Sequence, residues 1–202
     1  CAETGILTHL VSMPIKQNSE QHELSLGHIK WLKSNYSNIT SHVIELDEVF
    51  KNFKQIMQNY DSELAFANSR SRLRMVTLYQ IAQSNNGLVV GTGNKVEDFG
   101  IGFYTKYGDG GVDISPIADC TKTQVWEMGE FLEIPKEIVK AEPTDGLWED
   151  GRSDVKQLGM SYQDLEKAMK DNNDPNYKKY LSIRKKNLHK MEPIPVCKFD
   201  ND

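Results

Sequence analysis

Short apolar runs alternate with longer amphipathic stretches along this chain, and the alternation predicts strands separated by helices. Four short apolar segments are typical of strands or of strand entries; they lie at residues 6–13, 42–46, 88–92 and 113–117. Apolar positions recur with helical spacing in longer segments; these lie at residues 19–35, 47–58, 66–83, 121–132 and 162–170. The run at 88–92 is apolar and flanked by glycines, so we expect a strand that is buried on both faces.

Strands that alternate with helices pair in parallel through right-handed crossovers. We therefore expect an α/β fold, a doubly wound parallel sheet flanked by helices, in a single domain that spans residues 1–202. Ligands of such folds bind at the carboxyl ends of strands. The residues just after Met13, Thr92 and Ile117 are therefore the first candidates for chemistry. Residues 1–5 have the pattern of a helix that ends at a glycine cap, so we expect the domain to be N-terminally incomplete.

Polar residues mark the expected helix starts. Asp47 and Ser161 are suited to cap helices, and Thr121 with Gln124 fits a capping box. Lys122 then lies at a helix N-terminus, where the helix dipole disfavours a cation by a few tenths of a kcal/mol. Two interpretations remain open, namely an anion bound between the lysine and the helix or a lysine in solvent.

Composition narrows the classes of function. The 202 residues are 38% hydrophobic and 26% charged, which suits a folded domain. No apolar run approaches the roughly 20 residues of a membrane helix, and no signal peptide pattern opens the chain, so we expect no membrane partner. The cysteines Cys1, Cys120 and Cys197 are far apart, which argues against a zinc site or a disulfide scaffold and favours the cytoplasm.

Charge is unevenly distributed. The net charge of −5 argues against nucleic acid as a partner. Residues 178–190, however, carry six Lys or Arg and no acid, in an expected helix. Such a run is either a solvated helix face or a contact for a small anionic ligand.

Candidate chemistry is concentrated in the glycine-rich stretch 93–112 and its borders, where we expect no long element. Glu97 and Asp98, in GTGNKVED, offer hard oxygen ligands of the kind that Mg²⁺ takes beside phosphates, although a turn with solvated acids is the alternative. The segment FYTKYGDGGVD combines aromatic rings, Lys106 and two carboxylates with glycines that let a ligand approach the backbone. That mixture suits a nucleotide, with a surface loop as the alternative. Arg70 and Arg74 lie one helical turn apart and could bind a phosphate together or form surface ion pairs.

Together these segments resemble the ammonia-dependent NAD synthetases of the N-type ATP pyrophosphatase superfamily. The resemblance covers nearly the whole chain; its motifs are VSMP, RSRLRM, LVVGTGNKVED, GFYTKYGDGGVDISPI, TKTQVWEMGEFLEIP, EPTDGLW and LHK. It implies an adenine nucleotide alpha hydrolase-like fold and a tight homodimer. It also implies that ATP adenylates the nicotinate carboxylate of deamido-NAD with release of pyrophosphate, that ammonia then displaces AMP to give NAD, and that Mg²⁺ is the cofactor.

The resemblance assigns roles to residues at matching positions. The expected ATP contacts are Thr92, Lys122 and Thr144, and the expected magnesium ligand is Glu97. The expected deamido-NAD contacts are Arg74, Lys106, Asp113, His189 and Lys190. The expected catalytic residues are Lys122 and Asp109, of which Asp109 matches a carboxylate proposed to help deprotonate ammonia. Because glycines flank Asp109, we expect the loop backbone to position it.

Two features depart from the family pattern. The pyrophosphate loop of the superfamily, Ser-Gly-Gly-x-Asp-Ser, does not occur in the sequence and is expected just upstream of Cys1, and Gly93 stands where an Asp usually follows the GT dipeptide. We find no glutaminase segment, so free ammonia is the expected nitrogen source. The alternatives are another N-type ATP pyrophosphatase, such as a GMP synthetase or a tRNA-thiolating enzyme, and a nucleotide-binding remnant without turnover.

Overall fold

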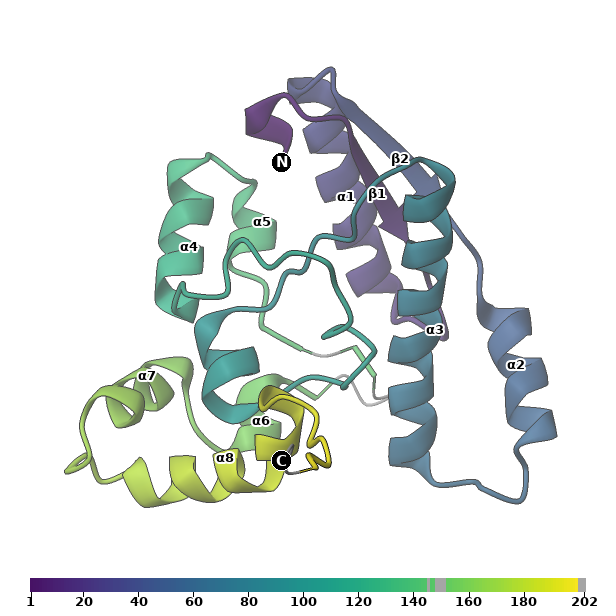
Figure 1. Ribbon diagram of the computed structural model, residues 1–202. Helices are drawn as coiled ribbons and strands as arrows, with labels where there is room; N and C mark the ends of the chain where they lie inside the picture. Colours follow the sequence, from purple (N-terminus) through teal and green to yellow (C-terminus); the bar gives the residue numbers. More distant parts are fainter. Residues whose placement is uncertain (145, 148–151, 200–202) are drawn as a thin grey trace.

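The computed structural model describes residues 1–144, 146–147 and 152–199 (Figure 1). Strands β1 (Thr8–Ser12) and β2 (Ile39–Val43) pair in parallel, with Thr8 opposite Ile39. Helix α1 (Ser19–Asn35) connects the two strands, so this part of the chain is a β–α–β unit. It provides the parallel pairing and the flanking helix expected of an α/β fold.

The other helices surround the central loops, with α2 and α3 on the side of the strand pair and α6, α7 and α8 gathered near the C-terminus (Figure 1). Their bounds are α2 Asp47–Ile56, α3 Glu63–Ser84, α4 Lys122–Phe131, α5 Lys136–Val139, α6 Asp154–Leu158, α7 Tyr162–Lys170 and α8 Tyr177–Met191. A short 3₁₀ turn, η1 (Ala2–Thr4), ends at Gly5 with φ of 75°, as the glycine-cap pattern predicts. None of the helices among the described residues has the length and apolar character needed to cross a membrane.

Two helix starts confirm the expected caps. The Thr121 hydroxyl accepts from the backbone of Gln124 at 3.3 Å, and the Gln124 side chain accepts from the backbone of Thr121 at 2.9 Å, so the capping box of α4 is complete. The Ser161 hydroxyl caps α7 by accepting from Asp164 N at 3.1 Å. Each of these caps joins residues that are only three positions apart, so its spacing can be read from the sequence.

The start of α2 differs from expectation. Asp47 does not cap the helix; its carboxylate accepts from Lys16 N at 2.7 Å, and Leu46 takes the cap position. The apolar run expected as a strand at 42–46 mostly follows β2, because the strand ends at Val43 and the buried Leu46 already precedes the helix. The predicted strand is therefore confirmed at residues 42–43 and wrong at residues 44–46.

The segment expected as a buried strand at 88–92 forms one parallel bridge, between Val90 and Ile114, among the described residues. Val89 is buried, but Val90 is 39% exposed, so the expectation of a strand buried on both faces is wrong. The hydrogen bonds explain the short pairing. Val89 O accepts from Ile114 N at 3.3 Å and Gly91 N donates to Ile114 O at 2.7 Å, and the chain then turns away.

The glycine-rich stretch contains a seven-residue π-helix, η2 (Lys95–Ile101). The side chain of Asn94 caps it by accepting from Val96 N at 3.0 Å and Glu97 N at 3.1 Å. Gly102 ends it with φ of 65°, a conformation that favours glycine. The sequence pattern did not indicate this element.

Side chains of α8 donate to the backbone carbonyls of η2 and of the loop after it. The donors lie three residues apart, on one face of the helix. Arg184 donates to the carbonyls of Phe99 and Gly100, Asn187 to that of Ile101, and Lys190 to those of Gly102 and Tyr104. We call these interactions the α8 carbonyl contacts. The basic run of the sequence is therefore partly engaged inside the protein.

Two apolar clusters form the core, one on each side of the central loops. The first joins η2 with α6, α7 and α8; its buried members are Val96, Ile101, Leu158, Met160, Tyr162, Leu165, Ala168 and Tyr180. The second joins the loop after β1 with α2 and α3; its buried members are Ile15, Leu46, Phe50 and Phe66. Elements from both clusters contribute residues to the site described next.

Candidate functional site

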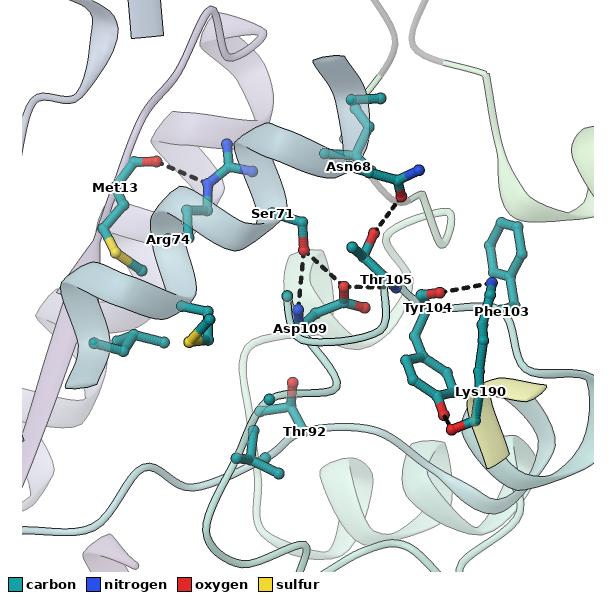
Figure 2. A pocket seen from close by; sticks show the side chains of 18 of the residues that line it. Met13, Asn68, Ser71, Arg74, Thr92, Phe103, Tyr104, Thr105, Asp109 and Lys190 are labelled. Carbon is teal, nitrogen blue, oxygen red and sulfur yellow. Dashed lines mark hydrogen bonds between the residues drawn. The ribbon is translucent and has the colours of Figure 1, made fainter. Parts of the chain in front are cut away.

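A cavity of about 410 Å³ opens between α3 and residues 103–112 (Figure 2). Its volume lies in the range of small-molecule sites. Polar side chains from several elements line it; they are Asn68, Ser71, Arg74, Thr92, Tyr104, Thr105, Asp109, Gln157 and Lys190. Apolar side chains cover much of the remaining wall, among them Met13, Met75, Leu78 and Val112. Both Met13 and Thr92, at the expected carboxyl ends of strands, therefore line the cavity.

Asp109 is fixed by α3 as well as by its own loop. Its Oδ1 accepts from the Ser71 hydroxyl at 2.7 Å and from Thr105 N at 2.9 Å, and Asp109 N donates to Ser71 Oγ at 2.9 Å (Figure 2). Gly108 permits this approach, since a Cβ there would lie 2.3 Å from Ser71 Oγ. The expectation that the loop backbone alone positions Asp109 is therefore incomplete.

Arg74 enters the cavity from α3. Its Nε donates to Met13 O at 3.0 Å and its Nη2 to Gln17 Oε1 at 3.2 Å. Burial lowers the pKa of Arg74, the charge of Arg70 lowers it further, and Asp109 opposes both. Arg70 is buried and donates to Leu147 O, so it does not lie at the surface, as the surface ion pair that was one of the two alternatives for Arg70 and Arg74 would require.

Lys190 reaches the cavity from the last turn of α8. Its ammonium donates to Gly102 O at 2.9 Å and Tyr104 O at 2.8 Å, and the Tyr104 hydroxyl donates back to Lys190 O at 2.5 Å (Figure 2). Burial lowers the pKa of Lys190, and the Asp109 charge counteracts this. An ammonium has three N–H donors, and two of those of Lys190 have acceptors among the described residues.

A second polar group lies at the N-terminus of α4. Lys122 Nζ is 2.8 Å from Glu97 Oε1, and the two side chains are only 17% and 16% exposed. Asn94 donates to the other oxygen, Oε2. Of the two interpretations of Lys122, a lysine in solvent is therefore wrong, since the ammonium is paired with a carboxylate that the protein itself supplies.

Tyr162, the first residue of α7, completes this group. Its hydroxyl donates to Glu97 Oε1 at 2.5 Å and also lies 2.7 Å from Asp154 Oδ2. Burial, followed by the charge of Glu97, raises the pKa of Tyr162 above its usual value. The phenol therefore keeps its proton at neutral pH and acts as a donor.

Asp98 follows Glu97 in η2. Its carboxyl packs directly on Gly93, where a Cβ would lie 1.9 Å from Asp98 Oδ2. Burial first, and then the charges of Asp109 and Glu97, raise the pKa of Asp98 to about 7. Gly93, which departs from the family pattern, is what makes room for this carboxyl.

The remaining sequence-predicted residues lie outside the cavity wall. Lys106 Nζ donates to His189 O at 2.7 Å, and His189 itself is exposed. Asp113 accepts from Val89 N at 2.7 Å and from the Tyr79 hydroxyl at 3.1 Å. Thr144 donates to Arg152 O at 3.1 Å. Four of the predicted residues line the cavity, namely Thr92, Arg74, Asp109 and Lys190. Two others, Glu97 and Lys122, form an ion pair with each other.

Sequence reasoning missed several residues of the site. Ser71 lies within the motif RSRLRM and Tyr104 within GFYTKYGDGGVDISPI, but the motifs alone do not identify either as a site residue. Tyr162 is predicted from the sequence only as the first residue of a helix. Asn94 is a cap and also a partner of Glu97, which the GTGNK motif could have indicated. No local signal identifies Tyr162, because its partner lies 65 residues away.

The donor set around Glu97 fits one magnesium bond. The described residues hold no group of three metal-ligating side chains, so a cage made by the protein alone is not present among them. Magnesium usually needs only one or two carboxylates beside phosphates and water. A carboxylate offers about four lone-pair sites. Lys122 and Tyr162 take two on Oε1 and Asn94 takes one on Oε2, which leaves one on Oε2.

Comparison with known families and relatives gives a consistent result. The sequence model of the family described as NAD synthase matches residues 7–197. An NH(3)-dependent NAD(+) synthetase from Carboxydothermus hydrogenoformans is 39% identical over 160 residues, which are 77% of this chain and 63% of that relative. The chain therefore spans less than two thirds of that relative's length. An NH(3)-dependent NAD(+) synthetase from Finegoldia magna is 32% identical over 93% of this chain and 76% of its own length.

Solved structures share the fold. The structure of NMN synthetase from Francisella tularensis has a TM-score of 0.88 and 30% identity, and the match covers 98% of this chain and 81% of that one. The NH3-dependent NAD synthetase from Campylobacter jejuni has a TM-score of 0.72 over 94% of this chain and 78% of its own. At 21% identity, the second comparison supports the fold alone. The expected α/β class with a parallel sheet flanked by helices is confirmed.

Proposed function

Because the chain belongs to the NAD synthase family, we propose that the protein is an ammonia-dependent NAD synthetase, with deamido-NAD, ATP and ammonia as substrates. The observation that supports this most directly is that Arg74, Lys190 and Asp109 line one cavity. Two cations suit the phosphates of a nucleotide substrate, and a carboxylate suits ammonium. The proposal covers the full-length protein, of which this chain holds these residues.

The first step forms a bond between the nicotinate carboxylate and the α-phosphorus of ATP and releases pyrophosphate. We assign Thr92, Lys122 and Thr144 to ATP, and Glu97 to the magnesium ion that ATP carries. Bound magnesium would neutralise part of the phosphate charge. Lys122 is suited to the same task, because its ammonium is held at a helix N-terminus by a carboxylate and not by bulk water.

In the second step the nitrogen of ammonia attacks the activated carbonyl, AMP leaves and the nitrogen loses a proton. Ammonium dominates at neutral pH, yet only the free base is nucleophilic. Asp109 is suited to hold ammonium and to accept a proton from it. Ser71 and Thr105 both donate to Oδ1 of Asp109, so we assign the other carboxylate oxygen, Oδ2, to the substrate. Lys106, Asp113 and His189 are assigned to deamido-NAD from outside the cavity wall.

A second candidate is the amidation of nicotinate mononucleotide to NMN. It is supported by the likeness to the Francisella tularensis structure, whose name gives NMN synthetase as its activity. The two reactions share the carboxylate, ATP and ammonia and differ only in the adenylate half of the acceptor. The ratio of kcat/KM for deamido-NAD and for nicotinate mononucleotide separates them.

The test uses the full-length protein with ATP, ammonium, Mg²⁺ and each acceptor in turn. We expect NAD, AMP and pyrophosphate from deamido-NAD, measured by chromatography. Formation of ADP and phosphate would refute the adenylation mechanism. ATP–pyrophosphate exchange that depends on a different acyl acceptor would instead support another N-type ATP pyrophosphatase, and no exchange with any acceptor would support a binding remnant.

We also propose a homodimer that works in the cytoplasm. Large apolar side chains are exposed along α2 and the start of α3, which suits a protein interface; they are Val49, Ile56, Tyr60 and Leu64. The wide spacing of the three cysteines supports a reducing compartment. Light scattering of the full-length protein tests the dimer, and a monomer at micromolar concentration would contradict it.

A further inference from the structure

Tyr162 contacts both members of the Glu97–Lys122 pair. Its hydroxyl donates to Glu97 Oε1 at 2.5 Å, and its ring lies under Lys122 Nζ, 5.0 Å from the ring centroid. Lys122 binds the same Glu97 oxygen at 2.8 Å. The phenol, the carboxylate and the ammonium therefore form a closed triangle in which each group touches the other two.

Tyr162 is itself held rigidly. The side chain is 2% exposed and belongs to the core cluster of η2, α6, α7 and α8. Trp126 packs against its ring edge-to-face, at 5.9 Å and 84°. Asp154 Oδ2 lies 2.7 Å from the hydroxyl. Because these contacts hold Tyr162 in place, its hydroxyl and ring can restrict Glu97 and Lys122, whose side chains have more rotatable bonds.

The contacts have a consequence for orientation. The hydroxyl of Tyr162 and the ammonium of Lys122 both bind Oε1, so they turn Oε2, with its open lone-pair site, the other way. The face of the ring attracts the ammonium electrostatically and keeps Lys122 beside the carboxylate. Loss of the hydroxyl would leave Glu97 with two of its three partners, Lys122 and Asn94, and so less firmly oriented, while the ring still supports Lys122.

We infer that Tyr162 is a positioning residue for the ATP-binding step, which sets the orientation of Glu97 and Lys122 without touching the substrate. The inference rests on the proposed function, because it assigns Glu97 and Lys122 to MgATP. Nothing in the sequence motifs identifies Tyr162, and its role follows only from the contacts between α7, η2 and α4.

The test is Tyr162→Phe, which removes the hydroxyl and keeps the ring. Calorimetry with the full-length protein gives the dissociation constants of ATP with and without Mg²⁺, and steady-state assays give KM and kcat. We expect the dissociation constant of MgATP to rise about tenfold, the lower end of the effect of losing a residue that orients a metal ligand. Binding of ATP without Mg²⁺ should change less, because Lys122 keeps its aromatic contact.

Tyr36→Phe is the matched control. Tyr36, the residue after α1, also donates its hydroxyl to a carboxylate, that of Glu3, at 2.8 Å, so the control loses a bond of the same kind outside the Glu97–Lys122 pair. This variant should bind MgATP like the parent. A Tyr162→Phe variant that also binds like the parent, or that loses stability alone in thermal melts, would overturn the inference. So would a Tyr162→Phe chain that fails to fold, since we assign the hydroxyl to orientation and not to folding.

A double-mutant cycle provides the sharpest readout. If Tyr162 acts through Glu97, then Tyr162→Phe should change the MgATP dissociation constant less than about twofold in a Glu97→Gln background. Additive effects would mean that the hydroxyl acts by another route. The experiment distinguishes failure of the inference from failure of the proposed function. If the parent protein does not bind MgATP, the proposed function is refuted. If the parent and Tyr162→Phe bind MgATP equally well, only the inference is refuted.

Discussion

Replacement of Asp98 by Asn should stabilise the protein at alkaline pH. The carboxyl of Asp98 is largely buried against Gly93, beside the charges of Asp109 and Glu97. Among the described residues it has no hydrogen-bond partner that would hold it in the charged form. Asn has nearly the same shape as protonated Asp but carries no charge, so it removes the penalty and keeps the packing.

The magnitude follows from the pKa. Folding moves the pKa of Asp98 from 3.8 to about 7, so the ionised carboxyl costs about 2–4 kcal/mol, with the lower part of the range allowing for screening by water. The folded state binds more protons than the unfolded state between these two values. Stability therefore falls as pH rises from about 4 to about 7, and the whole cost is present above pH 7.

Urea denaturation from about pH 4 to about pH 8, in buffer with EDTA, gives the free energy of unfolding for the parent and Asp98→Asn. The variant should be more stable by about 2–4 kcal/mol at about pH 8, and the difference should vanish near pH 4. Asp61→Asn, at an exposed position, is the control for a lost negative charge. A difference that does not depend on pH, or a variant that is less stable at about pH 8, would refute the reasoning.

Three further predictions concern the proposed reaction and the α8 carbonyl contacts. Glu97→Gln keeps the size of the side chain but removes its charge, so kcat/KM for ATP should fall at least about tenfold and recover partly at high Mg²⁺; unchanged kinetics at limiting Mg²⁺ would contradict the magnesium role. Asp109→Asn should permit adenylation and slow amidation, so that NAD-adenylate accumulates in single-turnover quench experiments; a block before adenylation would assign the residue to ATP instead. Arg184→Met leaves two carbonyls of η2 without their donor, so the free energy of unfolding should fall by about 1–2 kcal/mol in urea titrations. The exposed Lys185→Met is its control, and equal effects of the two would mean that the α8 carbonyl contacts contribute nothing.

The sequence predicted the local elements well, because their signals lie within a few residues. Helix α1 spans the expected residues 19–35 and α7 the expected 162–170. The capping box at Thr121 formed as its spacing indicates. Sheet pairing was predicted less well. The segment 88–92 depends on a partner more than 20 residues away, and an apolar run does not reveal how long that partner stays alongside.

The candidate site shows the same limit. Segments that the sequence pattern indicated do come together, since Arg74, Asp109 and Lys190 line one cavity. What each charge contacts could not be read from spacing. Lys106 is bound by a carbonyl of α8, and Asp113 accepts a backbone N–H at the start of the bridged segment. These partners are set by tertiary contacts, which no pattern along the chain encodes.

During protein synthesis, the donors of the α8 carbonyl contacts are made after the carbonyls that they bind. The carbonyls of Gly100 and Gly102 leave the ribosome 84 and 88 residues before their donors on α8. At a synthesis rate of about 5–20 residues per second, this is a delay of roughly 4–17 s. During that interval η2 and the loop behind it have neither their donors nor the apolar surface of α8. The nascent chain therefore carries an unfinished cavity wall throughout this interval, when chaperones and proteases have access to it.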